Sequence, residues 1–86
     1  MVQKNIFQIE DTFSIAGRGT IIAGTLISGQ LQKGMRATIN GKSAVITQVE
    51  QQHKTLESVS QAGSKLGVSL SNVDKNDITL GSISFE

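Results

Sequence analysis

Three residues in the middle of the chain, Gly41-Lys42-Ser43, match the end of a phosphate-binding loop. In such a loop backbone N–H groups surround the phosphates, and the motif needs another glycine five residues before Gly41 and a helix directly after the serine. Position 36 is an arginine, however, and the Ala-Val-Ile run at 44–46 is typical of a strand. The sequence therefore favours a hairpin turn here over a nucleotide site.

Other side chains that could do chemistry are sparse. His53 is the only histidine and cysteine is absent, so we expect neither a metal site nor a catalytic triad around it. Glu10 with Asp11, and Asp74 with Asp77, could pair as general acid and base. Both pairs lie among turn or edge residues, where solvated charges are far commoner. We therefore expect no enzyme activity, no metal and no cofactor.

Arg18 is held between Gly17 and Gly19. A tight glycine turn would project this arginine away from the fold, where its guanidinium suits bidentate contacts with phosphate or carboxylate. A plain solvated turn residue is the alternative. The sequence alone leaves both interpretations open.

The elements that must position these residues are predicted to be β-strands. Nine glycines fall between short apolar runs, and proline is absent. Four apolar residues alternate at period two, with Asp11 breaking the series, and predict one half-buried strand: Phe7, Ile9, Phe13 and Ile15. Residues 20–27 are apolar at both parities, which predicts a strand covered on both sides. Within that run, Gly24 indicates a bulge or a close backbone approach.

The strongest hairpin signal is Asn40-Gly41, between the segments 36–39 and 42–49. Asparagine and glycine readily supply the two left-handed residues of a type I′ turn. Residues 51–60 are polar, and we expect them to form a loop that crosses one end of the fold.

A further strand is expected at 65–70, and Ile83 and Phe85 mark the last one. Six or so short strands without a helical period predict an all-β, small closed barrel, a form that also removes exposed sheet edges. The length fits a single domain over residues 1–86.

Composition narrows the choice of partner. Eight basic residues stand against seven acidic ones, a formal charge of +1, and the only aromatic residues are three phenylalanines in strand-like contexts. Proteins that bind nucleic acid usually carry an excess of basic residues, which neutralise phosphates, and exposed aromatic residues, on which bases stack. The chain has no apolar run long enough for a signal peptide or a membrane span. We expect a soluble, cytoplasmic protein that binds neither DNA nor membranes.

An ordered set of motifs runs through nearly the whole chain, from about residue 6 to residue 85. It comprises Glu10-Asp11-Thr12-Phe13-Ser14-Ile15, Gly17-Arg18-Gly19-Thr20, Gly24, Ser28-Gly29, Lys33-Gly34, Val49-Glu50, Ala62-Gly63, Gly67-Val68, Leu70, Asp77-Ile78 and Leu80-Gly81. Together these motifs resemble the second domain of translational GTPases of the elongation factor Tu type. The resemblance implies a six-stranded barrel of Greek-key type. Related barrels occur in the selenocysteine-specific factor and in initiation factors. In the family a GTP-binding domain precedes this barrel, whereas the 86 residues contain none.

The resemblance also implies candidate binding residues. In the family the Gly-Arg-Gly-Thr corner, here led by Gly17 and Arg18, faces the small ribosomal subunit, and a nearby pocket helps hold the aminoacylated 3′ end of tRNA. The positions that correspond to this pocket include Ile21, Glu50, His53 and Lys54. His53 stands where tRNA carriers have arginine, and Ser69 replaces an apolar wall residue.

Charges that the carriers show after the central glycine are absent here, where residues 24–29 read Gly-Thr-Leu-Ile-Ser-Gly. We therefore expect a non-enzymatic binding or adaptor module with a protein partner, such as a GTPase or a translation component. Leu26 and Ile27 could form part of an apolar patch, although one of them must be core. The alternative partner is RNA, either the tRNA acceptor end or the ribosome, and a substrate or cofactor domain of an enzyme ranks third.

Overall fold

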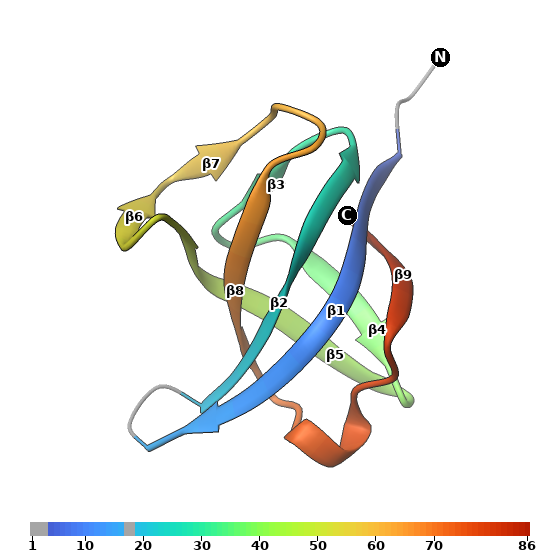
Figure 1. The fold of residues 1–86 in the computed structure, drawn as a ribbon. Coiled ribbons are helices and arrows are strands. Elements are labelled where there is room, and N and C mark those ends of the chain that lie inside the picture. The colour runs from blue at the N-terminus through green and yellow to red at the C-terminus, as the bar shows by residue number, and fades with distance from the viewer. Residues whose placement is uncertain (1–3, 17–18) are drawn as a thin grey trace.

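The computed structural model describes residues 4–16 and 19–86, which form a barrel of six antiparallel strands (Figure 1). Its strands are β1 (Asn5–Ile15), β2 (Gly19–Ser28), β4 (Arg36–Ile39), β5 (Lys42–Gln51), β8 (Lys65–Ser71) and β9 (Gly81–Phe85). They pair in the order β4-β5-β8-β2-β1-β9. Two backbone hydrogen bonds of 2.8 Å between Arg36 and Glu86 draw the ends of this path together. The predicted small barrel of Greek-key type is confirmed, and it closes at a seam between β4 and β9.

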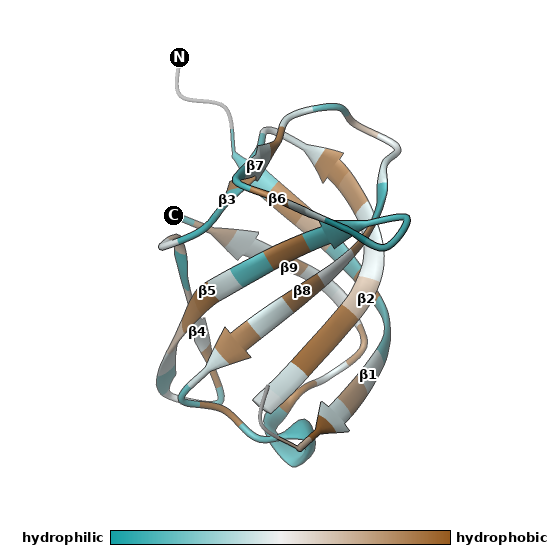
Figure 2. Ribbon diagram, turned by 90° about the vertical axis from the view of Figure 1, so that its left-hand side faces the viewer, coloured by the Kyte–Doolittle hydropathy of each residue, from teal (hydrophilic) through white to brown (hydrophobic). Residues whose placement is uncertain are grey.

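Inward-facing apolar side chains fill the barrel. The largest fully buried ones are Phe7, Ile22, Leu26, Leu31, Ile46, Leu70, Val49 and Val68. Burying one such side chain stabilises a fold by about 1.5–3 kcal/mol, so this cluster is the main source of stability. Figure 2 shows β2 hydrophobic over much of its length, beside the banded colouring of β5 and β8. On β2 one side of the strand is buried and the other is only half-buried, so the predicted cover on both sides holds in part.

A bulge at Glu10 changes which side of β1 faces the core. Ile9 pairs with Gly24 while Asp11 pairs with the next residue of β2, so Glu10 is the extra residue. Phe7 and Ile9 point inward before the bulge, and the following odd-numbered residues point outward. The prediction that Phe13 and Ile15 share the buried face of Phe7 is therefore wrong, because one inserted residue reverses the alternation.

Gly24 lies opposite this bulge, and the predicted close approach is confirmed. A Cβ atom at Gly24 would overlap the carbonyl oxygen of Gln8. Glycine is required here because β1 crosses β2 too closely for any side chain.

Residues 51–60 are more ordered than the predicted loop. They contain two short strands, β6 (Lys54–Leu56), which pairs with β5, and β7 (Ser58–Val59), which pairs with β3 (Leu31–Gln32). The prediction of a crossing loop is wrong for this segment, because backbone pairing with β5 and β3 organises it despite its polar composition.

The hairpin prediction at Asn40-Gly41 is confirmed, with φ of 51° and 77° at the two residues. The segment Gly41-Lys42-Ser43 is thus a turn that leads into β5, not a phosphate-binding loop. Its Lys42 ammonium lies 2.9 Å from the Asp77 carboxylate.

Asp77 belongs to the short 3₁₀ helix η1 (Lys75–Asp77), and the expectation of a solvated charge is wrong for it. Its side chain is only 9% exposed and accepts hydrogen bonds from Lys42 Nζ (2.9 Å), Asn40 Nδ2 (2.8 Å) and the Asp74 backbone N–H (2.8 Å). The pKa of Asp77 lies well below the ordinary range of a carboxyl, first because of the Asp74 N–H and then because of Lys42 and Asn40. Asp77 therefore fastens η1 to the β4–β5 turn.

Candidate partner-binding face

The β5–β6 hairpin brings three of the predicted site residues together. Glu50 pairs across the hairpin with Thr55, and Lys54 pairs with Gln51. The turn between them consists of Gln52 and His53, with φ of 51° and 68°. Two left-handed residues match a type I′ turn. Neither is glycine, and each side chain in this conformation costs roughly 1–2 kcal/mol. His53 and Lys54 are exposed, whereas Glu50 is half-buried.

A local network orients Glu50. Gln48 Nε2 donates hydrogen bonds to the Glu50 carboxylate (2.7 Å) and to Thr55 Oγ1 (3.0 Å). Across the sheet Glu50 pairs with Gly67 of β8, which has no side chain to cover the carboxylate. The carboxylate is therefore positioned on the outer surface of the barrel.

A shallow hollow of about 360 Å³ lies beside this hairpin. Small residues make much of its floor, namely Ala23, Gly24 and Gly67. Glu50, Gln52 and His53 line one side, and Glu10 and Lys65 line another. The structure thus brings Glu50 and His53 to one site.

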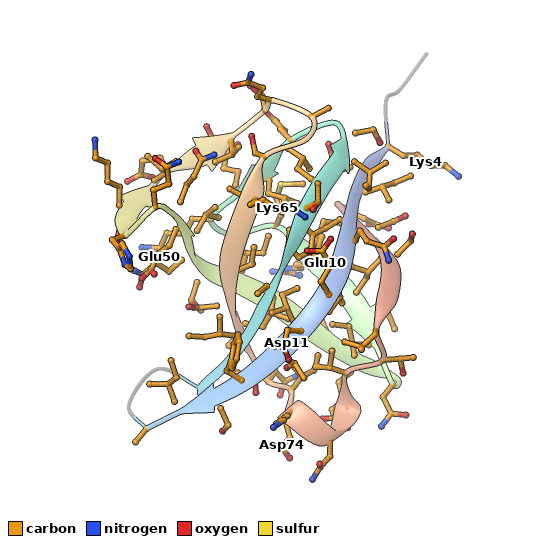
Figure 3. All side chains as sticks on the ribbon, in the orientation of Figure 1. Lys4, Glu10, Asp11, Glu50, Lys65 and Asp74 are labelled. Carbon is orange, nitrogen blue, oxygen red and sulfur yellow. The ribbon has the colours of Figure 1, made fainter. Side chains whose placement is uncertain are left out.

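Glu10 and Lys65 form an ion pair at the rim of this hollow. The Lys65 ammonium lies 3.0 Å from Glu10, which also accepts a hydrogen bond from Thr25 Oγ1 at 3.1 Å. Figure 3 shows the two charged side chains pointing toward one another from β1 and β8. The Lys65 hydrogen bond lowers the pKa of Glu10. Because the two charges are opposite, the pair leaves this rim close to neutral.

The fourth predicted residue, Ile21, lies on the same outer side of β2. It is half-buried and pairs directly with Phe13 of β1. Phe13 and Ile15 are 44% and 42% exposed. Sequence reasoning missed both as surface residues: Asp11 interrupts the apolar alternation between Ile9 and Phe13, but the prediction continues the alternation across it with the same parity. The three apolar side chains form what we call the arm patch (Phe13, Ile15 and Ile21). Phe13 and Ile15 lie on the part of β1 that continues past its pairing with β9, whereas Ile21 still pairs with Ser69 of β8. Figure 1 shows this end of β1 and β2 at the lower left.

Two further pairs of residues were singled out in the sequence, Gly17 with Arg18 and Leu26 with Ile27. Gly17 and Arg18 lie outside the described residues. Leu26 is completely buried and is the core residue of its pair, whereas Ile27 is 48% exposed. Ile27 is six residues along β2 from Ile21, or about 20 Å, so it lies apart from the arm patch.

Within residues 4–16 and 19–86, no three His, Asp or Glu side chains gather as a metal site would require. The same residues include no helix long and apolar enough to cross a membrane. The outer face presents apolar side chains, the oriented Glu50 carboxylate and the Glu10–Lys65 ion pair.

Comparison with known proteins places the chain in a family. The family model of elongation factor Tu domain 2 matches residues 19–83. The structure of translation elongation factor SelB from Methanococcus maripaludis, in its apo form, superposes with a TM-score of 0.82 at 21% sequence identity. That match covers 96% of this chain but 18% of the SelB chain, so the chain spans about a fifth of that protein. At this identity the likeness shows the fold alone. Because the family model covers most of the sequence, the chain belongs to the elongation factor Tu domain 2 family.

Proposed function

We propose that this barrel is a non-enzymatic binding module of the translation-factor type that engages a protein partner through the arm patch. The observation that carries the proposal is the exposure of Phe13 and Ile15 beside Ile21, on the part of β1 that continues past its pairing with β9. When a partner covers an exposed apolar side chain, binding is favoured by about 25 cal/mol for each Å² of apolar surface that is removed from water. Clusters of such side chains commonly mark interaction sites.

Charge favours protein over RNA at this face. The formal net charge is +1, and Lys65, the basic residue that lines the hollow, is already paired with Glu10. Glu50 adds a negative charge on the opposite side of the hollow. A surface that neutralises phosphates needs an excess of unpaired basic side chains, and the described part of this face offers none in excess.

One observation supports RNA as the second candidate. Glu50 and His53, two of the positions that resemble the tRNA acceptor-end pocket of the family, line one hollow together with Gly67. Ile21 lies near this glycine, since a Cβ atom added at Gly67 would be 4.0 Å from Ile21 Cγ2. Binding of an RNA end there would use Glu50 as a hydrogen-bond acceptor. It would also place a base against apolar side chains.

Site-specific photocrosslinking in cells distinguishes these partners. The photoreactive residue p-benzoylphenylalanine replaces Phe13 in one variant and Lys33, an exposed residue of the turn after β3, in the control. We expect a discrete protein adduct from position 13 that survives RNase and is absent from position 33. Purified partner should then bind with an affinity that changes little with salt and falls on Phe13→Asp substitution.

Other outcomes are equally informative. Adducts at position 13 that RNase removes would replace the protein partner by RNA, and binding would then fall steeply with salt. Equal labelling from positions 13 and 33 would show that the arm patch is not the binding face.

A further inference from the structure

The seam between β4 and β9 leaves strand edges without partners. Arg36 and Glu86 exchange both of their backbone hydrogen bonds, which is the pattern of an antiparallel pair. If the strands stayed together, the next such pair would be Thr38 with Ser84. Among the described residues, no backbone hydrogen bond joins Thr38 to Ser84, so the two strands diverge beyond Arg36.

The direction of the free groups follows from strand geometry. Backbone N–H and C=O groups of alternate residues point to the same edge of a strand. Since Glu86 bonds toward β4, Ser84 and Ser82 also present their N–H and C=O groups toward β4, while Ile83 faces β1. On the opposite edge, Thr38 presents its groups toward β9. The free edge of β9 is the longer one, because two of its residues, Ser82 and Ser84, present backbone groups that are unpaired among the described residues, whereas β4 presents those of Thr38.

A groove lies between these edges. One hollow of about 380 Å³ and another of about 510 Å³ share Thr38, Ser82 and Ile83 in their linings, so they are continuous along the seam. The smaller hollow has a mixed lining, in which four isoleucines (Ile9, Ile39, Ile78 and Ile83) lie among polar residues of β4, η1 and β9. Figure 1 shows β4 and β9 on the same side of the barrel, away from β6 and β7.

Neither edge carries the features that usually prevent strand addition. Natural sheet edges are protected by charged side chains, prolines or bulges. The β9 sequence is Gly-Ser-Ile-Ser-Phe, and β4 has a single charge, Arg36, at the end that is already paired. The serine side chains of β9 are small and exposed, so they leave the backbone accessible.

We propose that this seam binds an extended peptide segment of another protein as an additional strand along β9. The peptide backbone would pair with Ser82 and Ser84, which is the strand-addition mode of peptide recognition. Its residue opposite Ile83 would lie on the inward face and insert an apolar side chain between Ile39 and Ile78. This inference is independent of the arm patch, because the two sites share no residue.

Geometry and charge identify a neutral peptide as the occupant. A second folded copy of this chain carries its own free edges inside the same kind of groove, with a strand on either side, so two barrels could not bring these edges together. The lining bears Arg36 and Glu86 at the closed end, and the Asp77 charge is already balanced by Lys42. With one free charge of each sign, the groove matches an uncharged segment and offers no site for a polyanion such as RNA.

The test uses synthetic nine-residue peptides, capped at both ends, in which threonine alternates with valine, isoleucine, leucine or phenylalanine. Each is titrated into ¹⁵N-labelled protein and followed by amide chemical shifts. We expect saturable binding by at least one peptide, with shifts concentrated at Thr38 and at residues 81–86. Two analogues, N-methylated on odd or on even backbone nitrogens, keep every side chain but remove one hydrogen-bonding edge. At least one analogue should fail to bind.

Two variants at one position separate the backbone from the side chain. Ser84→Pro removes an N–H that faces the groove and not β1, so binding should weaken about tenfold. Ser84→Ala keeps that N–H, so its affinity should change less than about twofold. Far-ultraviolet circular dichroism checks that both variants keep the fold.

Several results would overturn the proposal. One is that no peptide binds saturably, and another is that both N-methylated analogues bind equally well. A third is that the amide chemical shifts change mainly in β6 and β7 instead of at the seam. Concentration-dependent self-association that broadens residues 81–86 without peptide would also reject it, in favour of a second copy as the occupant. If Ser84→Pro does not fold, the N-methylated analogues still decide the outcome.

Discussion

Asp77 shows how one carboxylate can fasten an end of a small barrel. Its folded pKa is depressed by the Asp74 N–H, Lys42 and Asn40, so the charged form is favoured in the fold. A depressed pKa contributes stability above the unfolded pKa and loses that contribution as the pH falls toward the folded pKa. The contribution of Asp77 should therefore be complete at neutral pH and should decline progressively below about pH 4.

We predict that Asp77→Asn is less stable than the wild type at pH 7 and that this difference shrinks as the pH falls from about 4 to 2. Urea unfolding followed by far-ultraviolet circular dichroism measures it at each pH, since the chain has neither Trp nor Tyr. The matched control is Glu57→Gln, because the Glu57 side chain has no hydrogen-bond or ion-pair partner among the described residues. Parallel pH profiles for wild type and Asp77→Asn would contradict this role.

At the scale of elements, the glycine positions and the apolar alternation predicted where the strands lie better than they predicted which side of each strand is buried. Asn40-Gly41 signals a type I′ turn by composition, and the β4–β5 hairpin follows. Gln52 and His53 form a turn with similar φ angles but contain no turn residue, so β6 could not be predicted from local composition. The bulge at Glu10 could not be predicted either. Phe13 has the same parity as Ile9 in the sequence, although it faces outward in the structure.

The candidate site was likewise predicted only in part. Motif order predicted the family, and two of the residues that it singled out, Glu50 and His53, line one hollow. The exposed Phe13 and Ile15 could not be predicted, because their exposure depends on the tertiary register between β1 and β2.

The β5–β6 turn carries a measurable stability cost. A non-glycine residue in the left-handed region costs roughly 1–2 kcal/mol, whereas glycine adopts it freely but loses more chain entropy on folding. We predict that His53→Gly raises the free energy of unfolding by about 0.5–1 kcal/mol. The urea midpoint reports this change.

Lys54→Gly is the control for this turn, because Lys54 lies in β6 without a left-handed conformation. It should lower the stability by about 0.5–1 kcal/mol, the usual cost of glycine in a strand. Equal destabilisation by both substitutions would show that the turn is not strained at His53.

At the scale of the whole molecule, the barrel is held unequally around its circumference. Strands β1, β2, β8 and β5 pair through long ladders, whereas the backbone hydrogen bonds found at the seam within residues 4–16 and 19–86 are those between Arg36 of β4 and Glu86, just after β9. Free edges are satisfied by water when no partner is present, so opening of the barrel should begin at this seam.

Native-state hydrogen exchange tests this asymmetry within a single strand. In β9 the amides of Ser82 and Ser84 face the seam and should exchange fast, close to the rate of an unstructured chain. Ile83 and Phe85 donate toward β1 and should be protected. The slowest amides should lie in β2 and β8, which stand at the centre of the strand order and farthest from the seam. Protection at Ser84 and Thr38 equal to that in β2 would mean that the seam is closed in solution. Fast exchange along the whole of β9 would mean instead that the strand detaches from β1. Alternating protection is the outcome that a firmly attached strand with one free edge requires.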